Sequence, residues 1–404
     1  MIELTTDAMA HRGEAVGRVD GKAHFVAGAL PGERVRGEVT HDGGSWARVR
    51  LLDVLDAAPS RVAPPCPHFT QCGGCQWQQA DVGAQLAWKR ETVAGQLAHL
   101  GRIVDADVRP TVSPGPPYGY RNRMDFRVLD GRPALHRSRS KDLVALDECH
   151  LLHPGLRDLF ESLGDLSGAS ALTLRVSEAT GQRLALVTGK VPGDADTWGC
   201  AVAQRSNRGL RKVIGALAIR EEVAGARLRI TGGAFFQNNT AGAAALASLV
   251  EEALEPTASD RMVDGYAGGG LFAATAGRSV REVVAIETST TAVEDLTHNL
   301  ETNGIHGEVI AGRFETELAS VAGQVDLLVV DPPRVGLRSE GVDAVLDTMP
   351  RTLAYVSCDP ASFARDAAAL VAGGYTLEWV APVDLFPQTW HIESVARFTR
   401  VGGG

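Results

Sequence analysis

The sequence predicts a multidomain α/β protein that ends in a doubly wound, mainly parallel sheet. Its 404 residues exceed what a single hydrophobic core usually holds. Short strand-like runs separated by glycine and proline occupy residues 1–57, whereas strand and helix patterns alternate over residues 231–404. We therefore expect a small β-barrel in the first of these regions, a doubly wound domain in the last, and an α+β region at 58–230 between them.

The composition is that of an ordinary water-soluble protein, with 44% hydrophobic and 22% charged residues. No apolar run approaches the ~18 residues that suggest a membrane span. The opening run M-I-E-L-T-T-D-A-M-A contains acids and no basic stretch, so we expect no secretory signal peptide. These features favour a cytoplasmic monomer without a membrane partner.

The charge is unevenly distributed along the chain. The net charge is -9, which argues against binding of nucleic acid by bulk charge alone. Residues 102–141 nevertheless carry nine Lys or Arg against four Asp. A local basic patch of this kind can steer a polyanion such as RNA. A solvated basic face explains the charge equally well.

The first region reads as a barrel of short strands. The runs G-E-A-V-G-R-V-D-G-K-A-H-F-V, A-L-P-G-E-R-V-R-G-E-V and W-A-R-V-R-L-L-D-V-L have the length and spacing of such strands. Small barrels often bind nucleic acid, but the fold alone does not establish that function. The proline-rich stretch A-A-P-S-R-V-A-P-P at 57–65 reads as a linker.

The central region combines one helix with several strands. A helix is expected around residues 85–100, with Leu86, Val93, Leu97 and Leu100 on its apolar face. This helix could also pack on the C-terminal domain. The runs M-D-F-R-V-L, L-T-L-R-V-S and R-L-A-L-V-T read as strands.

Four cysteines of the central region suggest a metal centre. Three of them, Cys66, Cys72 and Cys75, fall within ten residues, and Cys149 is the candidate fourth ligand. Four thiolates can hold Zn²⁺ or an iron–sulfur cluster. Four-cysteine zinc sites usually contain two C-x2-C pairs, and the single pair here favours iron–sulfur. Unligated thiols are the alternative.

Strands and helices alternate throughout the C-terminal region. The apolar pattern predicts strands at 262–263, 283–286, 307–311, 326–330, 352–356, 376–381 and 394–400, and helices at 271–276, 290–302 and 361–370. This alternation is typical of a doubly wound sheet, whose ligands bind at the carboxyl ends of the strands.

A glycine loop at the first of these strands suggests a nucleotide-type site. The run V-D-G-Y-A-G-G-G-L-F contains Gly268 and Gly270 where a strand turns into a helix. Glu287 ends the next strand, where an acid commonly binds ribose hydroxyls, and Asp331 ends another strand at the same edge. The pattern suits an adenosine-containing ligand but is not G-x-G-x-x-G. Tight turns with a surface Glu are the alternative.

Cys358 lies in the run Y-V-S-C-D-P, between a predicted strand and a predicted helix. Free cysteines are more often small apolar core residues than nucleophiles. The strand-to-helix loop is, however, where α/β enzymes place their chemistry. The position alone therefore leaves both interpretations open. Glu393, before the final strand, reads on its own as an exposed strand residue.

Taken together and in order, these motifs resemble the S-adenosylmethionine-dependent RNA uridine C5-methyltransferases. The resemblance covers essentially the whole chain, and the branch it fits has a TRAM barrel and a [4Fe–4S] cluster. It implies a Rossmann-like class I methyltransferase sheet, an OB-like barrel and a central cluster-bearing domain. The motifs that carry it are F-F-Q-N-N (235–239), D-G-Y-A-G-G-G-L-F (264–272), D-P-P-R-V-G (331–336), Y-V-S-C-D-P (355–360), D-L-F-P-Q-T-W-H-I-E (384–393), Y-R-N-R (120–123) and the four cysteines.

The resemblance also implies a role for each matching residue. Cys358 would be the nucleophile and Glu393 the base in forming 5-methyluridine in ribosomal or transfer RNA. S-adenosylmethionine would bind to Gln237, Tyr266, Gly268, Gly270, Glu287 and Asp331. Cys66, Cys72, Cys75 and Cys149 would hold the cluster, and RNA would contact Arg121, Asn122, Arg123 and Arg334.

Some positions depart from the family pattern: Gln388 stands where a His is frequent, and Gly312–Phe314 where an acid or amide often helps hold the cofactor. The family usually has S-C-N-P, whereas this chain has Asp359 beside the thiol. A carboxylate there opposes thiolate formation unless it is paired or points away.

Three other functions fit parts of the pattern. D-P-P-R is similar to the D-P-P-Y loop of amino-methylating enzymes, which need no cysteine. Methylation of cytosine C5 also uses a cysteine nucleophile. A non-catalytic iron–sulfur protein that binds RNA is the third alternative.

Overall fold

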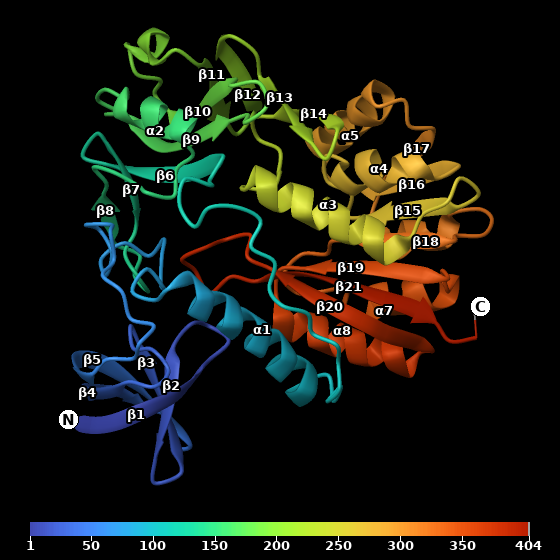
Figure 1. Cartoon of the computed structure of the whole chain (residues 1–404). Coiled ribbons are helices and arrows are strands. Elements are labelled where there is room, and N and C mark those ends of the chain that lie inside the picture. The colour runs from blue at the N-terminus through green and yellow to red at the C-terminus, as the bar shows by residue number, and fades with distance from the viewer. Residues whose placement is uncertain (403–404) are drawn as a thin grey trace.

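The computed structural model describes residues 1–402. A barrel formed by the N-terminal strands, a central sheet and a C-terminal sheet follow one another along the chain, and the helix α1 (Val82–His99) lies between the barrel and the C-terminal sheet (Figure 1). No helix within residues 1–402 combines the length and the apolar character needed to cross a membrane.

The N-terminal barrel is closed, in the strand order β1-β2-β3-β5-β4. Alternate residues of its strands point inward and form a small apolar core that includes Leu4, Val26 and Val49. Gly17 is required where β1 and β2 approach, because a Cβ there would lie 2.2 Å from the Thr5 carbonyl oxygen. The strands are β1 (Ile2–Met9), β2 (Ala15–Val19), β3 (Lys22–Ala27), β4 (Arg34–Asp42) and β5 (Trp46–Asp56). The predicted barrel is confirmed.

The central region forms a seven-stranded sheet in the order β12-β11-β10-β9-β6-β7-β8. The helix α2 (Pro154–Glu161) covers it and contributes Leu156, Leu159 and Phe160 to the core between them. The strands are β6 (Arg123–Leu129), β7 (Arg132–His136), β8 (Leu143–Ala145), β9 (Ala169–Val176), β10 (Arg183–Gly189), β11 (Ala201–Ser206) and β12 (Gly209–Ile214). A hairpin of β13 (Ala218–Val223) and β14 (Ala226–Thr231) leads from this sheet to the C-terminal one.

The C-terminal sheet has the order β17-β16-β15-β18-β19-β21-β20, with β21 antiparallel to both of its neighbours. Its strands are β15 (Arg261–Gly265), β16 (Glu282–Glu287), β17 (Gly307–Ala311), β18 (Leu327–Val330), β19 (Thr352–Ser357), β20 (Tyr375–Val383) and β21 (Glu393–Arg400). The predicted doubly wound alternation is confirmed, and each predicted element differs from the observed one by at most a few residues.

Helices cover both faces of this sheet. One face packs against α3 (Thr240–Leu254), α4 (Leu271–Thr275) and α5 (Thr290–Thr302). The other face packs against α1, α6 (Phe314–Glu317), α7 (Arg338–Thr348) and α8 (Pro360–Ala372). With apolar layers on both sides, the parallel strands β15, β16, β18 and β19 are almost completely buried, as their continuous apolar sequences indicate, whereas the edge strand β17 is partly exposed.

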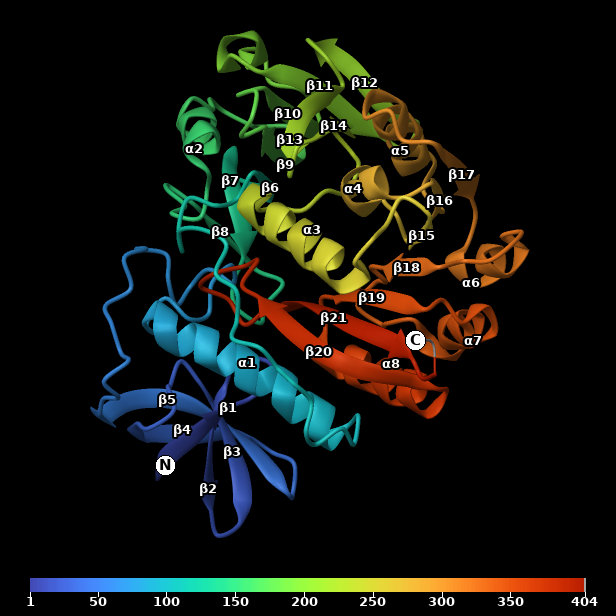
Figure 2. The same ribbon diagram turned by 45° about the vertical axis from the view of Figure 1, so that its right-hand side comes forward.

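The helix α1 precedes the central sheet in sequence but packs on the C-terminal one, beside α8 and β20 (Figure 2). Val93 and Leu97 belong to the same buried cluster as Phe363 of α8. The expected apolar face is wrong in part, because Leu100 is 44% exposed. The buried face instead includes the polar residues Gln85 and Lys89, both contributed by α1.

Candidate active site

A cavity of about 600 Å³ opens at the carboxyl ends of the parallel strands in the C-terminal sheet; we call it the sheet-edge cavity. Loops that follow β14, β15, β16, β18 and β19 contribute to its wall. Eight of the expected functional residues line it: Gln237, Tyr266, Gly268, Glu287, Asp331, Arg334, Cys358 and Glu393. Residues separated by more than 150 positions in sequence thus share one site.

The glycine loop forms one side of the sheet-edge cavity. Gly268 has a positive φ of 55°, and a Cβ there would meet nothing within 4 Å. The backbone is therefore open to a ligand at this point. Gly270 does not line the cavity but precedes the first turn of α4 with φ of 85°, where a Cβ would lie 2.6 Å from the Leu296 side chain.

Glu287 is fixed at the end of β16 by two backbone donors. The Gly268 N–H donates to Oε2 at 2.8 Å, and the Ser289 N–H donates to Oε1 at 2.7 Å. The carboxylate thus joins the glycine loop to the next strand and stays at the cavity wall. A carboxylate in this place can accept hydrogen bonds from ribose hydroxyls.

Tyr266 presents its ring to the cavity while its hydroxyl is engaged elsewhere. The hydroxyl donates to Glu315 at 2.8 Å, and the ring lies 4.8 Å from that of Phe314. Burial, together with the Glu315 carboxylate, raises the pKa of Tyr266 far above its usual range. The residue therefore remains a neutral aromatic wall at physiological pH.

Two buried carboxyl groups face each other across the sheet-edge cavity. Burial raises the pKa of Asp331 to about 7. Glu393, the first residue of β21, is 7% exposed, and burial followed by repulsion from Asp331 raises its pKa well above the usual range. A carboxyl group in this state can exchange a proton near neutral pH, which general acid–base chemistry requires.

Cys358 follows β19 directly and precedes α8. Burial is the largest cause that raises the pKa of its thiol to about 12, and the Glu393 and Asp331 carboxylates add to it. Arg334 acts in the opposite direction. The free protein therefore holds Cys358 as a neutral thiol, and its ionisation depends on the charges of the other cavity residues.

The Asp359 carboxylate is paired. It caps α8 by accepting hydrogen bonds from the Ala361 and Ser362 N–H groups at 3.1 and 2.8 Å. His11 of the barrel lies 3.4 Å from its other oxygen. Burial raises the pKa of Asp359, but the His11 and Ser362 donors outweigh this and hold it well below its usual range. The contact of His11 with Asp359 could not be predicted from the sequence.

Asn122 occupies a different place from the one expected. It is 4% exposed, and its side-chain amide donates to the Gln237 carbonyl at 3.1 Å and to Thr240 Oγ1 at 3.0 Å. These bonds join the start of the central sheet to the F-F-Q-N-N segment. A buried, fully engaged amide does not support the direct RNA contact expected of Asn122.

The three arginines of the expected RNA set lie in different surroundings. Arg334 is exposed at the mouth of the sheet-edge cavity. Arg123 pairs with Asp125 at 3.0 Å and donates to the Ala234 carbonyl at 3.1 Å. The Arg121 guanidinium lies 5.5 Å from the ring centroid of Phe386, and Arg121 also lines the cavity around the four clustered cysteines.

The four clustered cysteines line a separate cavity of about 220 Å³, the cysteine cavity. Burial raises the pKa of Cys72, Cys75 and Cys149, and neighbouring thiols add to the effect. Within residues 1–402 no three His, Cys, Asp or Glu side chains come together closely enough for one metal ion. The sequence-based prediction of a metal cluster is therefore not confirmed.

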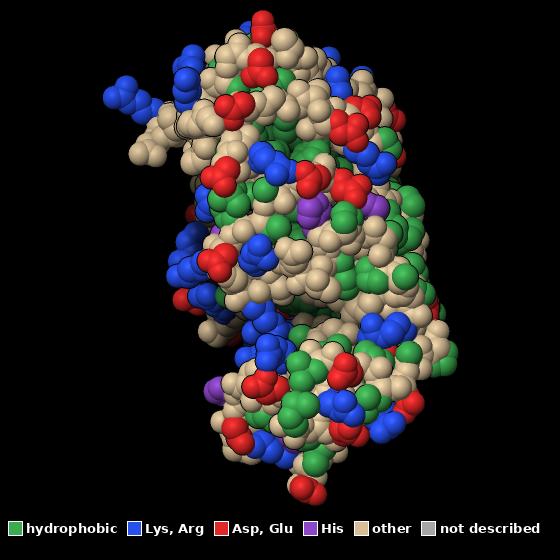
Figure 3. Space-filling model, turned by 90° about the vertical axis from the view of Figure 1, so that its left-hand side faces the viewer, with side chains coloured by type: hydrophobic (Ala, Val, Ile, Leu, Met, Phe, Trp, Pro, Cys, Tyr) green, Lys and Arg blue, Asp and Glu red, His purple; other side chains and the backbone are tan. Residues whose placement is uncertain are grey.

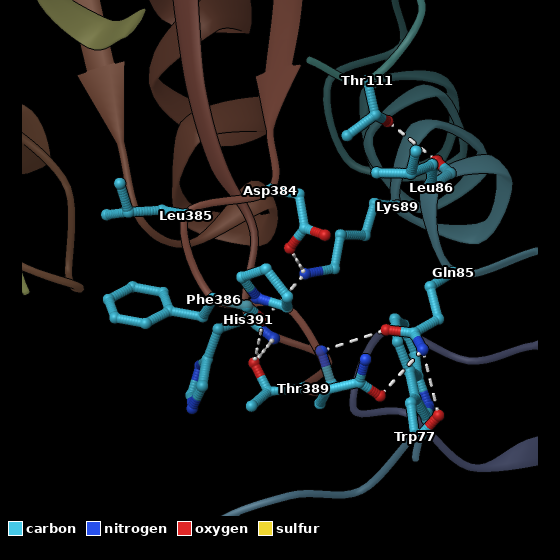
Figure 4. Close-up of polar contacts among 12 residues, drawn as sticks. Trp77, Gln85, Leu86, Lys89, Thr111, Asp384, Leu385, Phe386, Thr389 and His391 are labelled. Carbon is cyan, nitrogen blue, oxygen red and sulfur yellow. Dashed lines mark hydrogen bonds and ion pairs between the residues drawn. The ribbon is translucent and has the colours of Figure 1, made fainter. Parts of the chain in front are cut away.

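A buried polar network between α1 and residues 384–389 escaped the sequence-based prediction (Figure 4). Lys89 of α1 and Asp384 form an ion pair at 2.5 Å with side chains that are 0% and 1% exposed. Lysine in an amphipathic helix usually faces water, so the position of Lys89 in the core could not be predicted from the sequence.

Three comparisons relate the chain to known proteins. The family model described as tRNA (Uracil-5-)-methyltransferase matches residues 213–401. An uncharacterized RNA methyltransferase of Gloeobacter violaceus is 35% identical, over 99% of this chain and 96% of that protein. Another from Streptomyces avermitilis is 33% identical, over 98% and 97% of the two chains.

A solved structure supports the same fold. The tRNA (uracil-54, C5)-methyltransferase of Pyrococcus abyssi, crystallised with S-adenosyl-L-homocysteine, superimposes with a TM-score of 0.80. It is 23% identical and covers 98% of this chain and 99% of its own. The barrel, the central sheet and the C-terminal sheet are thus similar in arrangement in the two proteins. With relatives matched over nearly its full length, the chain belongs to the RNA methyltransferase family of these proteins, and its residues 213–401 match the tRNA (uracil-5-)-methyltransferase model.

Proposed function

We propose that this protein forms 5-methyluridine in ribosomal or transfer RNA, with S-adenosylmethionine as the methyl donor. The observation that carries the proposal is that Cys358 and Glu393 line the same cavity as the glycine loop and Glu287. A nucleophile, a buried carboxyl group and a site for an adenosine ligand are together what methylation of pyrimidine C5 requires. We further propose that it acts as a cytoplasmic monomer.

The residues of the sheet-edge cavity fit S-adenosylmethionine. Glu287 offers carboxylate oxygens to the ribose, and the open backbone at Gly268 admits the ligand closely. Gln237, Tyr266 and Asp331 line the same wall, and Gly270 allows the turn into α4. When bound, S-adenosylmethionine supplies an electrophilic sulfonium methyl group.

Cys358 makes the uracil ring reactive. Uracil C5 is too weak a nucleophile to take a methyl group unaided, and addition of the thiolate to C6 places electron density on C5. In the free protein the raised pKa of Cys358 disfavours the thiolate. A protonated Glu393 removes one of the charges that oppose ionisation, and Arg334 favours it, so the cavity can form the thiolate once substrate is bound.

Glu393 completes the reaction by acting as a base. After C5 receives the methyl group, its proton must leave before the double bond can return. Glu393 first releases its own proton to solvent. Its carboxylate then takes the C5 proton, the C5–H electrons re-form the C5–C6 double bond, and the C6–S bond breaks to release the Cys358 thiolate. The burial of Glu393 keeps water away from this step.

RNA reaches the cavity only if the target base leaves its stack. We assign RNA binding to the barrel (1–57) and the central region (58–230). We assign the methyl transfer reaction to residues 231–404 together with α1. A cleft of about 750 Å³, the basic cleft, lies between the barrel and the central region and is lined by Arg12, Arg48, Arg137 and Arg139. Figure 3 shows Lys and Arg side chains gathered at the hollow above the barrel.

The cysteine cavity fits an iron–sulfur cluster better than one ion. Four-cysteine zinc sites usually contain two C-x2-C pairs, and these four cysteines contain only one. Four cysteines around a larger space would hold a [4Fe–4S] cluster that organises the RNA-facing loops. Protein purified without oxygen should then contain iron and sulfide in equal amounts. A variant without the cluster that keeps its fold and full affinity for RNA would contradict this structural role.

The proposed chemistry is tested by trapping the covalent adduct. RNA containing 5-fluorouridine has no C5 proton for Glu393 to remove, so the C6–S bond should persist and shift the protein on a denaturing gel. The Cys358→Ala variant should form no adduct. An active methyltransferase whose activity survives Cys358→Ala would instead indicate amino methylation, and an absence of both adduct and activity would indicate a non-catalytic protein.

A further inference from the structure

The segment that delivers Glu393 to the sheet-edge cavity is residues 384–392, the 384–392 loop between β20 and β21. Its Phe386 lines the cavity. Five distant segments hold its backbone; in one of them, the Val112 carbonyl accepts from the Asp384 N–H at 2.8 Å. The Gln76 and Trp77 N–H groups donate to the Gln388 carbonyl at 3.0 and 3.1 Å. The Tyr120 hydroxyl donates to the Pro387 carbonyl at 3.0 Å, and the Asn239 amide to the Leu385 carbonyl at 3.1 Å. The Lys89 ammonium donates to the Phe386 carbonyl at 3.2 Å.

Lys89 binds the start of this loop. Its ammonium donates to Asp384 Oδ1 at 2.5 Å as well as to the Phe386 carbonyl, and it lies 5.8 Å from the ring centroid of Trp77 (Figure 4). The Lys89 and Asp384 side chains are 0% and 1% exposed. From within the core, the ammonium therefore fixes one side chain of the loop, Asp384, and one backbone carbonyl, that of Phe386.

Gln85, one helical turn earlier, binds the middle of the loop. Its Oε1 accepts from the Gln388 N–H at 3.0 Å, and its Nε2 donates to Gln388 Oε1 at 3.1 Å and to the Trp77 carbonyl at 3.1 Å. Residues four apart share one face of a helix, so Gln85 and Lys89 act from the same side of α1. Two successive turns of α1 thus hold the loop over most of its length.

The burial of this ion pair is not explained by stability alone. Removing both charges from water costs free energy that their attraction often fails to recover, and apolar residues of similar size would usually hold the fold as well. The directed donors of an ammonium do, however, select one loop conformation. The charges that face Glu393 include Lys89, Arg334 and Asp331, so Lys89 also lies within electrostatic reach of the carboxyl group.

We propose that Lys89 and Gln85 of α1 are positioning residues that hold the 384–392 loop so that Glu393 reaches the pyrimidine ring. This inference rests on the proposed function. It makes α1 part of the active-site machinery, although its residues precede the catalytic domain and do not line the sheet-edge cavity. The consequence is specific to one step. Removing the contacts of Lys89 and Gln85 with the 384–392 loop slows proton removal by Glu393 and leaves the earlier addition of Cys358 intact.

The test uses the full chain with the double variant Lys89→Met, Asp384→Leu. This variant avoids leaving one buried charge alone, which Lys89→Met by itself would do. The substrate is RNA from cells that lack the protein, and the methyl donor is S-adenosylmethionine. We expect the release step to slow at least about tenfold, within the range that general base catalysis contributes. The methylated covalent intermediate should therefore accumulate on denaturing gels, while RNA and S-adenosyl-L-homocysteine bind with unchanged affinity.

A matched control is the double variant Arg351→Met, Asp260→Leu. This pair also links two segments of the catalytic domain, with contacts at 2.5 and 3.0 Å, but it lies at the amino ends of β15 and β19, away from the cavity. The control should release product at the wild-type rate. A uniform loss of binding, addition and release in the Lys89 variant, or equal accumulation of intermediate in both variants, would overturn the inference.

A second readout does not depend on catalysis. Gln85→Met and the Lys89 double variant should both speed amide hydrogen exchange in residues 384–392 and leave that of β19 unchanged. Unchanged exchange in the loop would overturn the inference even if neither variant folds well enough for kinetics. If the wild-type protein itself forms no intermediate and no methylated product, the proposed function fails instead, so the two failures are distinguishable.

Discussion

At the scale of single residues, the proposed nucleophile Cys358 lies in surroundings that oppose its ionisation. Burial and the carboxylates of Glu393, Asp331 and Asp359 raise the pKa of its thiol to about 12. A neutral thiol reacts slowly with oxidants and electrophiles, so the free enzyme is protected until substrate is bound. Activation then depends on the protonation of Glu393 and on Arg334, which makes the cavity, and not the cysteine alone, the catalytic unit.

This state of Cys358 predicts how fast the free protein is alkylated. The thiolate fraction rises about tenfold per pH unit below the pKa, so the rate of carbamidomethylation at Cys358 should rise steadily between pH 7 and 9. Glu393→Gln removes a carboxylate that raises this pKa and should accelerate the reaction. Peptide mass spectrometry separates Cys358 from the other cysteines. A rate that is already constant at pH 7 would show that the thiolate is present in the free protein.

Asp359 predicts a pH-dependent link between the barrel and the catalytic loop. Because its pKa is lowered in the folded protein, the stabilisation is present above about pH 4, the usual range for Asp, and is lost as the pH falls further. Asp359→Asn keeps an oxygen for the α8 cap but loses the pairing with His11. We expect a coupling of about 0.2–1 kcal/mol between Asp359→Asn and His11→Gln in a double-mutant cycle of urea unfolding at pH 7. Full additivity of the two changes would contradict this link.

At the scale of elements, the carboxyl ends of adjacent strands gather the site. β15, β16, β18 and β19 are parallel neighbours, so the loops after them meet at one edge. This adjacency could be predicted from sequence, because each βα unit is a local pattern of apolar periodicity. The packing of α1 on the C-terminal domain was expected, but its individual partners, α8 and the 384–392 loop, could not be predicted, since they are more than 250 residues away in sequence. The burial of Gln85 and Lys89 follows from that distant packing and leaves no local signal.

Asp264 of β15 predicts a pH-dependent loss of stability. The residue is 0% exposed, and burial raises its pKa to about 8, although the Ala273 N–H donates to it at 2.8 Å. Between about pH 4 and 8 the folded state keeps a proton that the unfolded state releases, so stability falls as the pH rises. Asp264→Asn keeps an acceptor for Ala273 and removes this titration.

Urea unfolding of the wild type and Asp264→Asn between pH 5 and 8 measures the effect. The wild type should lose up to about 1.4 kcal/mol per pH unit relative to the variant. The difference between the two proteins cancels most contributions from other titrating groups. A difference that does not change with pH would show that Asp264 is ionised in the folded protein.

At the scale of the whole molecule, apolar side chains join the barrel to the rest of the protein. Leu30 of the loop after β3, Trp77 of the segment after the cysteines and Trp88 of α1 belong to one buried cluster. Beside this junction lies the basic cleft. Its arginines contrast with the net negative charge of the whole protein. RNA should therefore be drawn to one face of the molecule and not to its surface in general.

This arrangement predicts a salt-dependent contribution from named arginines. Arg12 and Arg137 lie on opposite sides of the basic cleft and are exposed. If each contacts one phosphate, Arg12→Ala with Arg137→Ala should lower the slope of log affinity against log salt by about 1.5. Filter binding of RNA between 50 and 300 mM salt measures the slope. Arg281→Ala, on the far side of the catalytic domain, is the control, and an equal decrease in slope for that variant would contradict the placement.

The formation of 5-methyluridine by Cys358 is tested most directly by identifying the methylated nucleoside. RNA from cells that lack the protein is incubated with the purified enzyme and isotope-labelled S-adenosylmethionine, digested, and analysed by liquid chromatography and mass spectrometry. The label should appear in 5-methyluridine alone and should vanish with Cys358→Ala. Label in 5-methylcytidine or in an amino-methylated base, or label in 5-methyluridine that survives Cys358→Ala, would contradict the proposed reaction.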